Sequence, residues 1–171
     1  IMTRRGTRMN WVGAFAPGTV GGRRAHPPKI QKIWWKKINN KENLKAIRSA
    51  ISATMLKEIV AERGHLAPDS YPVVLDEKFE SLDKTKKVLE SFEKMGLNEE
   101  IHRIDNKHIR AGKGKSRGRK YKSSKGPLIV VSKNSGLGKA VANIPGIDIV
   151  EVKNLNAELL APGGRPGRLT L

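Results

Sequence analysis

The sequence contains no cysteine, which excludes disulfide bonds, thiolate zinc sites and a cysteine nucleophile. Its apolar runs reach only about four residues, whereas a helix needs roughly 20 to cross a bilayer. The first residues are charged but include no apolar segment of the kind found in a secretory signal. These absences predict an intracellular protein.

Acidic residues are few, and their distribution is uneven. The 171 residues include 34 Lys and Arg against 16 Asp and Glu, a formal net charge of +18. Residues 1–41 carry ten basic residues and no acidic one, and residues 103–125 carry ten basic residues with Asp105 as their only acid. The rest is close to neutral, with 14 basic and 15 acidic residues. Solubility alone does not require this segregation, so it predicts a polyanionic partner.

The densest basic stretch is residues 110–121, R-A-G-K-G-K-S-R-G-R-K-Y. Glycines separate its cations, and Ala111 is its only aliphatic residue. Because glycine has little preference for any backbone region, we expect this stretch to order only against a polyanion such as a folded RNA. The candidate RNA-binding residues here are Arg110, Lys113, Lys115, Arg117, Arg119, Lys120 and Tyr121.

Residues 1–38 contain five glycines and three prolines, and their apolar residues follow neither the strand nor the helix period. This composition predicts a long extended loop, and a loop of this length usually has a function. Cations interleaved with aromatic rings suit RNA, whose phosphates take the charges and whose bases stack on the rings; these rings are Trp11, Phe15, Trp34 and Trp35. An alternative for Trp34 and Trp35 is that they cover the edge of the protein's own core. The candidate binding residues are Arg4, Arg5, Arg8, Arg23, Arg24, His26 and Lys29.

The remainder of the chain, residues 39–171, has periodic apolar patterns. Apolar spacings of three and four predict helices at residues 41–63, 84–95, 137–143 and 155–160. Asn39 and Asp83 are the expected N-caps of the first two, and Gly64 and Gly96 the expected terminators. Short all-apolar runs predict buried parallel strands at residues 73–75, 128–131 and 147–152, with a further strand opening at residue 168.

This order of elements predicts an α/β fold, with a three-layer parallel sheet flanked by helices and right-handed crossovers. The sequence thus divides into two parts. Residues 1–38 would be an extended basic loop, and residues 39–171 a globular α/β domain with a second basic loop at residues 110–126.

The sequence contains no recognisable catalytic constellation. Gly138-Lys139 has Lys133 and Ala140 where a Walker loop needs Gly and Ser or Thr, and Gly114-Lys115-Ser116 has Ile109 where it needs Gly and follows no apolar strand. The four histidines include no pair at metal-binding spacing. We interpret His65 as a partner of a helix C-terminus, and Glu99 and Glu100 as solvated residues or caps. The sequence therefore predicts no enzymatic activity, no cofactor and no metal.

Four separate motifs resemble one known family. They are G-A-F-A-P-G-T-V-G-G-R-R-A-H-P-P at residues 13–28, R-S-A-I-S-A-T at 48–54, R-A-G-K-G-K-S-R-G-R-K-Y at 110–121 and L-A-P-G-G-R-P-G-R-L-T at 160–170. Together they resemble the archaeal and eukaryotic form of large-subunit ribosomal protein four, the archaeal form more closely. The similarity runs in order over nearly the whole chain.

The resemblance implies a structural constituent of the large ribosomal subunit that binds rRNA and supports subunit assembly. It implies an α/β domain on the subunit surface and a long loop, here residues 1 to about 28, that lines the peptide exit tunnel beside ribosomal protein twenty-two. It also implies that a strand, a helix and one loop arm of the family precede this chain, and that a few residues follow it. One strand of the sheet is thus expected to be absent.

Two other classes of function remain as alternatives. A non-ribosomal RNA-binding or chaperone module would share the composition and would bind many RNAs alike. An RNA-modifying enzyme on the same scaffold would need a cofactor-binding glycine turn or a cluster of acids, and neither pattern is present.

Overall fold

The computed structural model describes residues 2–13, 16–133 and 136–171. The chain divides into two compact units, Ile1–Ile38 and Asn39–Leu171. Within the described ranges, no helix combines the length and the apolar character that crossing a membrane requires.

The first unit begins with a β-hairpin, which the sequence did not predict. Strands β1 (Met2–Arg5) and β2 (Arg8–Gly13) pair antiparallel, and Arg5 is opposite Arg8. The two residues between them form the turn, and Gly6 has a φ of 63°, as the first residue of a tight hairpin turn requires. The prediction of a wholly extended loop is therefore wrong for residues 2–13, because the tight turn at Gly6 lets the flanking residues pair.

A second turn follows at residues 16–22. The Thr19 hydroxyl donates a hydrogen bond to the Ala16 carbonyl (2.8 Å), and the Gly22 amide donates to the Thr19 carbonyl (3.0 Å). From there to the start of the second unit the chain forms turns and extended segments without a helix or strand.

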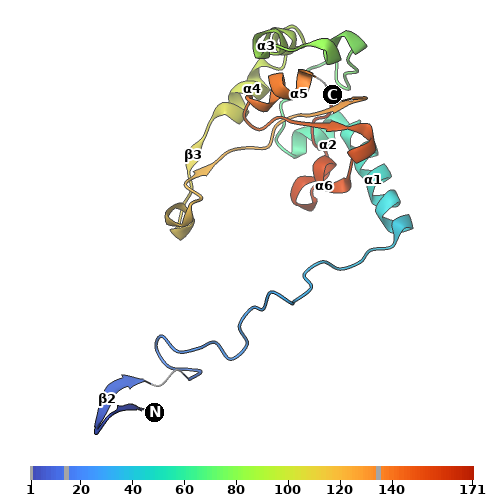
Figure 1. Ribbon diagram of the computed structural model, residues 1–171. Helices are drawn as coiled ribbons and strands as arrows, with labels where there is room; N and C mark the ends of the chain where they lie inside the picture. Colours follow the sequence, from blue (N-terminus) through green and yellow to red (C-terminus); the bar gives the residue numbers. More distant parts are fainter. Residues whose placement is uncertain (1, 14–15, 134–135) are drawn as a thin grey trace. The chain divides into compact units, whose positions relative to one another are not determined.

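The second unit combines helices with two small sheets (Figure 1). Its helices and strands are α1 (Asn40–Thr54), α2 (Lys57–Glu62), α3 (Thr85–Lys94), α4 (Asn98–Asp105), β3 (His108–Ile109), β4 (Tyr121–Lys122), β5 (Leu128–Val131), α5 (Gly136–Ala142), β6 (Asp148–Glu151) and α6 (Ala157–Leu160). Short 3₁₀ helices lie at Glu77–Ser81, Lys113–Arg117, Val152–Asn154 and Pro162–Gly164.

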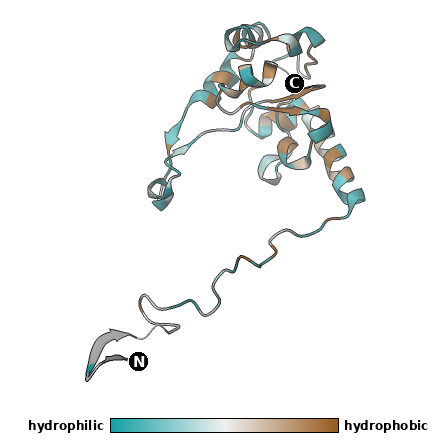
Figure 2. Cartoon of the chain, in the orientation of Figure 1, coloured by the Kyte–Doolittle hydropathy of each residue, from teal (hydrophilic) through white to brown (hydrophobic). Residues whose placement is uncertain are grey.

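The parallel pair β5 and β6 separates two apolar clusters. Ile129 and Val131 belong to the cluster that includes Val88 and Phe92 of α3. Their neighbour Leu128 belongs to the other cluster, which includes residues of α1 and α6. Because successive strand residues point to opposite faces, helices cover both faces of the pair, and Figure 2 shows apolar residues gathered there. The predicted buried strand at residues 128–131 and the α/β class are confirmed.

The sheet itself is smaller than predicted. A single parallel bridge joins Leu128 to Thr170, supported by a hydrogen bond from the Leu128 amide to the Leu169 carbonyl (2.8 Å). The predicted strand at residues 73–75 is absent, and Val74 is 91% exposed. A strand needs a neighbour to supply backbone donors and acceptors, and an apolar run in the sequence does not specify that neighbour.

The predicted helix at residues 41–63 is two helices in the structure. Leu56 adopts an extended conformation between α1 and α2. The Thr54 hydroxyl donates to the Ile51 carbonyl (2.7 Å), and the Thr54 carbonyl accepts a hydrogen bond from the Tyr71 hydroxyl. A carbonyl that accepts a hydrogen bond from outside its helix favours an interruption of the helix. The contact between Tyr71 and Thr54 therefore explains why α1 ends although the apolar period continues into α2.

The helix terminators were predicted better than the caps. Gly64 and Gly96 follow α2 and α3 with φ values of 95° and 75°, as left-handed helix ends require. Asn39 precedes α1 but makes no side-chain capping bond, and the residue before α3 is Lys84, not Asp83. Spacing identifies where a helix begins, but the rotamer of the cap depends on its surroundings.

Arg168 is the cation that joins the end of the chain to the sheet. Its side chain is fully buried and donates to the Gly126 carbonyl (2.8 Å), the Leu159 carbonyl (3.1 Å) and Asp148 (2.6 Å). Burial raises the pKa of Asp148, but hydrogen bonds from Arg168 and Lys125 hold it below its ordinary value.

Replacing Gly167 by alanine should destabilise the second unit by at least about 2 kcal/mol, because strain and overpacking add. Gly167 has a φ of 86°, and a Cβ there would lie 2.7 Å from both the Ile59 carbonyl oxygen and its Cγ2. Chemical denaturation measures the loss. Gly163→Ala is the matched control, because Gly163 has a φ of 73° but nothing within 4 Å of the added Cβ. Equal losses in the two variants would refute the close packing at Gly167.

Candidate nucleic-acid interface

The basic stretch at residues 110–121 forms a closed hairpin. Strands β3 and β4 pair antiparallel at its base, and the Arg110 amide donates to the Lys120 carbonyl (2.8 Å). The 3₁₀ helix Lys113–Arg117 forms the tip, where Gly118 ends it in the left-handed region at a φ of 77°. The expectation that this stretch has no order of its own is wrong. Backbone hydrogen bonds between β3 and β4 order it, although it makes few apolar contacts.

The hairpin presents its cations to solvent. It extends away from the helices of the second unit, as Figure 1 shows beside the label β3. Lys113, Lys115, Arg117, Arg119 and Lys120 are exposed. Arg110 is half-buried, and its Nε donates to the Arg119 carbonyl (3.1 Å), so this arginine also stabilises the hairpin. No acidic residue interrupts the stretch, so its cations are available to phosphates.

Aromatic rings accompany the cations in both units. Tyr121 is 57% exposed, and the Lys120 ammonium lies 5.4 Å from its ring centroid. Trp34 is 67% exposed, and the Lys32 ammonium lies 4.7 Å from its ring. Trp35 is 91% exposed. A ring with a cation above it offers both a stacking surface and a charge to a nucleotide.

The remaining candidates lie in the first unit. Arg4 and Arg5 belong to β1, and Arg8 begins β2. Arg23, Arg24, His26 and Lys29 follow the turn at residues 16–22, and all four are exposed. Phe15 lies outside the described residues. The structure thus places the candidates in two groups, one in each unit.

Sequence reasoning missed a buried polar cluster in the second unit. Glu100 and His65 are 0% and 4% exposed, and His65 Nδ1 lies 2.6 Å from Glu100 Oε1. Since a carboxylate only accepts, Nδ1 is the donor. The expectation that Glu100 is solvated is wrong. A signal was present in the spacing, because Glu100 and Arg103 are three residues apart and so share a face of a helix.

Arg103 completes this cluster. Its Nε and Nη2 bind the two oxygens of Glu100, both at 2.7 Å, and Nη2 also donates to the Lys125 carbonyl (2.8 Å). The Leu66 amide donates to Glu100 as well (3.0 Å). Burial raises the pKa of Glu100, but the hydrogen bonds from Arg103, His65 and Leu66 together lower it below its ordinary value of 4.5. The carboxylate therefore stays charged and fixes α4 against the end of α2 and the base of the hairpin.

No group of three His, Cys, Asp or Glu side chains in the described ranges is arranged to hold a metal ion. The candidate interface instead consists of exposed cations and aromatic rings.

A family profile matches this chain almost throughout. The profile is described as "Ribosomal protein L4/L1 family", and it matches residues 2–169. The chain belongs to the ribosomal protein L4/L1 family.

Several of the chain's relatives are archaeal uL4 proteins. The chain is 50% identical to the large ribosomal subunit protein uL4 of Nanoarchaeum equitans, over 100% of this chain and 64% of that protein. It is 49% identical to the uL4 proteins of Methanocaldococcus jannaschii, over 92% of the chain, and of Archaeoglobus fulgidus, over 91%. These two matches cover 64% and 62% of the relatives. The chain thus spans somewhat less than two thirds of their length, and the predicted resemblance to an archaeal-type member is confirmed.

Proposed function

We propose that this chain is a structural constituent of the large ribosomal subunit in the cytoplasm and that it binds rRNA through two basic arms. The observation that carries the proposal is the exposed hairpin at residues 108–122, whose cations have no acidic neighbour within the stretch. Membership of the L4/L1 family supports the ribosomal setting. The candidate residues bind phosphates, exposed rings stack on bases, and no residue has a catalytic role.

Each arm has its own task in this proposal. The hairpin anchors the second unit to rRNA and supports subunit assembly. The first unit threads through the rRNA, and its tip lines the peptide exit tunnel beside ribosomal protein twenty-two. Arginine suits both arms because its guanidinium bridges two phosphate oxygens or stacks on a base. RNA shape, and not a base-edge code, selects the site.

The proposal extends to the arrangement of the sheet and its helices. Helices packed on both faces of β5 and β6 support a three-layer arrangement. In this three-layer arrangement, the parallel sheet is wider than the pair β5 and β6. The helices that flank the sheet hold the base of the hairpin at a fixed position.

A salt titration tests the proposal. The chain should bind archaeal large-subunit rRNA more tightly than an unrelated structured RNA of equal length, and log affinity should fall steeply with log salt because contacts to phosphates release counterions. Fluorescence anisotropy measures the affinity for each RNA and its salt slope across roughly 50–500 mM KCl, about one decade of salt concentration. Equal affinity for the two RNAs would favour a general RNA-binding module and contradict the ribosomal assignment.

A further inference from the structure

A second basic site lies at the base of the hairpin, outside the residues predicted from the sequence. A depression of about 480 Å³ is lined there by Arg63, Arg103, Lys122, Lys125 and Arg165. Ser123, Ser124, His65 and His108 also line it. No acidic residue lines the depression. Five cations from four separate segments therefore converge on one space.

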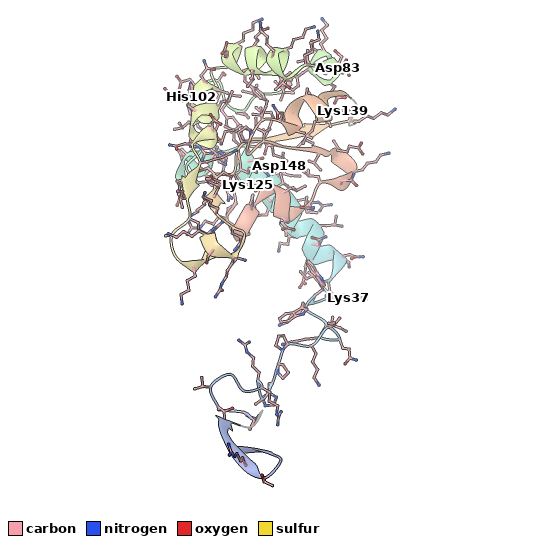
Figure 3. The ribbon with its side chains drawn as sticks, turned by 60° about the vertical axis from the view of Figure 1, so that its left-hand side comes forward. Lys37, Asp83, His102, Lys125, Lys139 and Asp148 are labelled. Carbon is pink, nitrogen blue, oxygen red and sulfur yellow. The ribbon has the colours of Figure 1, made fainter. Side chains whose placement is uncertain are left out.

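Two of these cations have carboxylate partners. Arg103 binds Glu100, and Lys125 Nζ lies 3.1 Å from Asp148, as the labelled pair in Figure 3 illustrates. Asp148 is shared with the buried Arg168. The two carboxylates thus pair with Arg103, Lys125 and Arg168. Among the described residues, Arg63, Lys122 and Arg165 form no ion pair with an acidic side chain.

Arg63 is held in place by backbone oxygens. Its guanidinium donates to the carbonyls of Pro162 (2.8 Å) and Arg165, and no carboxylate of the described residues forms an ion pair with it. Burial, together with the positive charges of Arg168 and Arg165, lowers the pKa of Arg63 below its ordinary value. The crowding of like charges around Arg63 costs free energy, and a bound anion would reduce that cost.

The remaining donors are available. Arg103 uses Nε and Nη2 in its contacts, and its Nη1 has no hydrogen bond to any described residue. Neither Lys122 nor Arg165 donates a side-chain hydrogen bond within the described part of the chain, and both are exposed. Because Glu100 fixes Arg103 on two atoms, this guanidinium loses little entropy when it binds a phosphate.

We propose that this depression binds a phosphodiester group of the RNA backbone where the hairpin joins the helical body. The volume suits a phosphate with its adjoining sugars, since small-ligand sites occupy roughly 300–1,000 Å³. Lys122 belongs to β4 and directly follows Tyr121, so a strand of RNA that lies along the hairpin reaches the depression without a gap in positive charge. This inference rests on the proposed rRNA binding and adds a distinct site to it.

The test compares charge removal at the depression with charge removal elsewhere. The double variant Lys122→Gln and Arg165→Gln removes two cations that make no side-chain hydrogen bond in the described structure. It should reduce the salt slope of rRNA binding by roughly 0.7–0.9, the contribution of one phosphate contact. The matched control is Lys86→Gln with Lys87→Gln, two exposed lysines of α3 that change the net charge equally. Equal slopes in both variants would overturn the site.

A tethered probe locates the RNA directly. The chain lacks cysteine, so Ser123→Cys provides a single attachment point for an iron–EDTA group beside the depression. Hydroxyl radicals should then cleave rRNA at discrete positions, whereas the same probe on Lys87→Cys should not cleave at those positions. Absence of cleavage from residue 123, with rRNA still bound specifically, would overturn the phosphodiester site and leave the proposed function intact. Loss of specific rRNA binding by the unmodified chain would instead refute the proposed function.

Inorganic phosphate separates an RNA site from a site for small anions. Millimolar phosphate at constant ionic strength should not change the difference in salt slope between the wild type and the double variant. The rRNA binds the hairpin as well as the depression, so free phosphate competes poorly with it. A slope difference abolished by phosphate would assign the depression to free phosphate and overturn the proposal.

Discussion

Replacing the five exposed cations of the hairpin by glutamine should reduce the salt slope of rRNA binding by roughly 3.5 to 4.5, at about 0.7–0.9 per phosphate contact. Affinity at low salt should fall by several orders of magnitude, because each lost contact removes the favourable release of counterions. The substitutions are Lys113→Gln, Lys115→Gln, Arg117→Gln, Arg119→Gln and Lys120→Gln. Arg110 is retained because it stabilises the hairpin.

The matched control replaces five exposed lysines of the second unit. Four lie in α3 or α5, and the fifth directly precedes α3. These are Lys84, Lys86, Lys87, Lys94 and Lys139, each replaced by glutamine. Fluorescence anisotropy across the same salt range compares the two variants with the wild type, and circular dichroism checks that both remain folded. If the hairpin variant kept the wild-type slope, the hairpin would have no part in the interface.

The second large effect is expected at Glu100. Glu100→Gln should lower the free energy of unfolding by about 3–5 kcal/mol at pH 7, because it leaves the Arg103 guanidinium without its carboxylate in a largely buried cluster. His65 and the Leu66 amide also lose their charged acceptor. Urea denaturation followed by circular dichroism measures the loss. Glu99→Gln is the control, since Glu99 is exposed on the same helix and should change stability by less than about 0.5 kcal/mol.

The pH dependence of this effect has a defined sign. The pKa of Glu100 is lower in the folded protein than its ordinary value of 4.5. The charged carboxylate therefore contributes its full stabilisation above pH 4.5, and this contribution is lost as the pH falls through the lowered folded pKa. The stability difference between wild type and Glu100→Gln should accordingly shrink with falling pH. A difference that stayed constant from pH 7 down to acid unfolding would contradict the charged cluster.

Much of the second unit could be predicted from its sequence. The run at residues 128–131 is apolar at every position, and it forms a strand covered on both faces. Gly64 and Gly96 end helices where the apolar period stops. These features depend on local sequence, since periodicity fixes which face is buried and glycine permits a left-handed helix end.

Other features depend on partners that are distant in sequence. The run at residues 73–75 is as apolar as a core strand, yet Val74 is exposed because no neighbouring strand pairs with it in the described structure. The helix predicted over residues 41–63 is interrupted where Tyr71 binds the Thr54 carbonyl. Neither outcome follows from local periodicity, because each is decided by a hydrogen-bond partner that the pattern does not specify.

The sequence by itself determined the two basic segments, the α/β class and the family, since charge segregation, periodicity and ordered motifs are properties of the chain. Only the tertiary structure decided which charged side chains form buried hydrogen bonds and ion pairs within the protein and which face solvent. Glu100, which the sequence predicts to be solvated or a cap, and Arg168 are both buried in hydrogen-bonded clusters. Arg63, Lys122 and Arg165 are far apart in sequence and meet at one depression. The physical reason is that the free energy of a charge depends on its burial and its neighbours, and folding sets both.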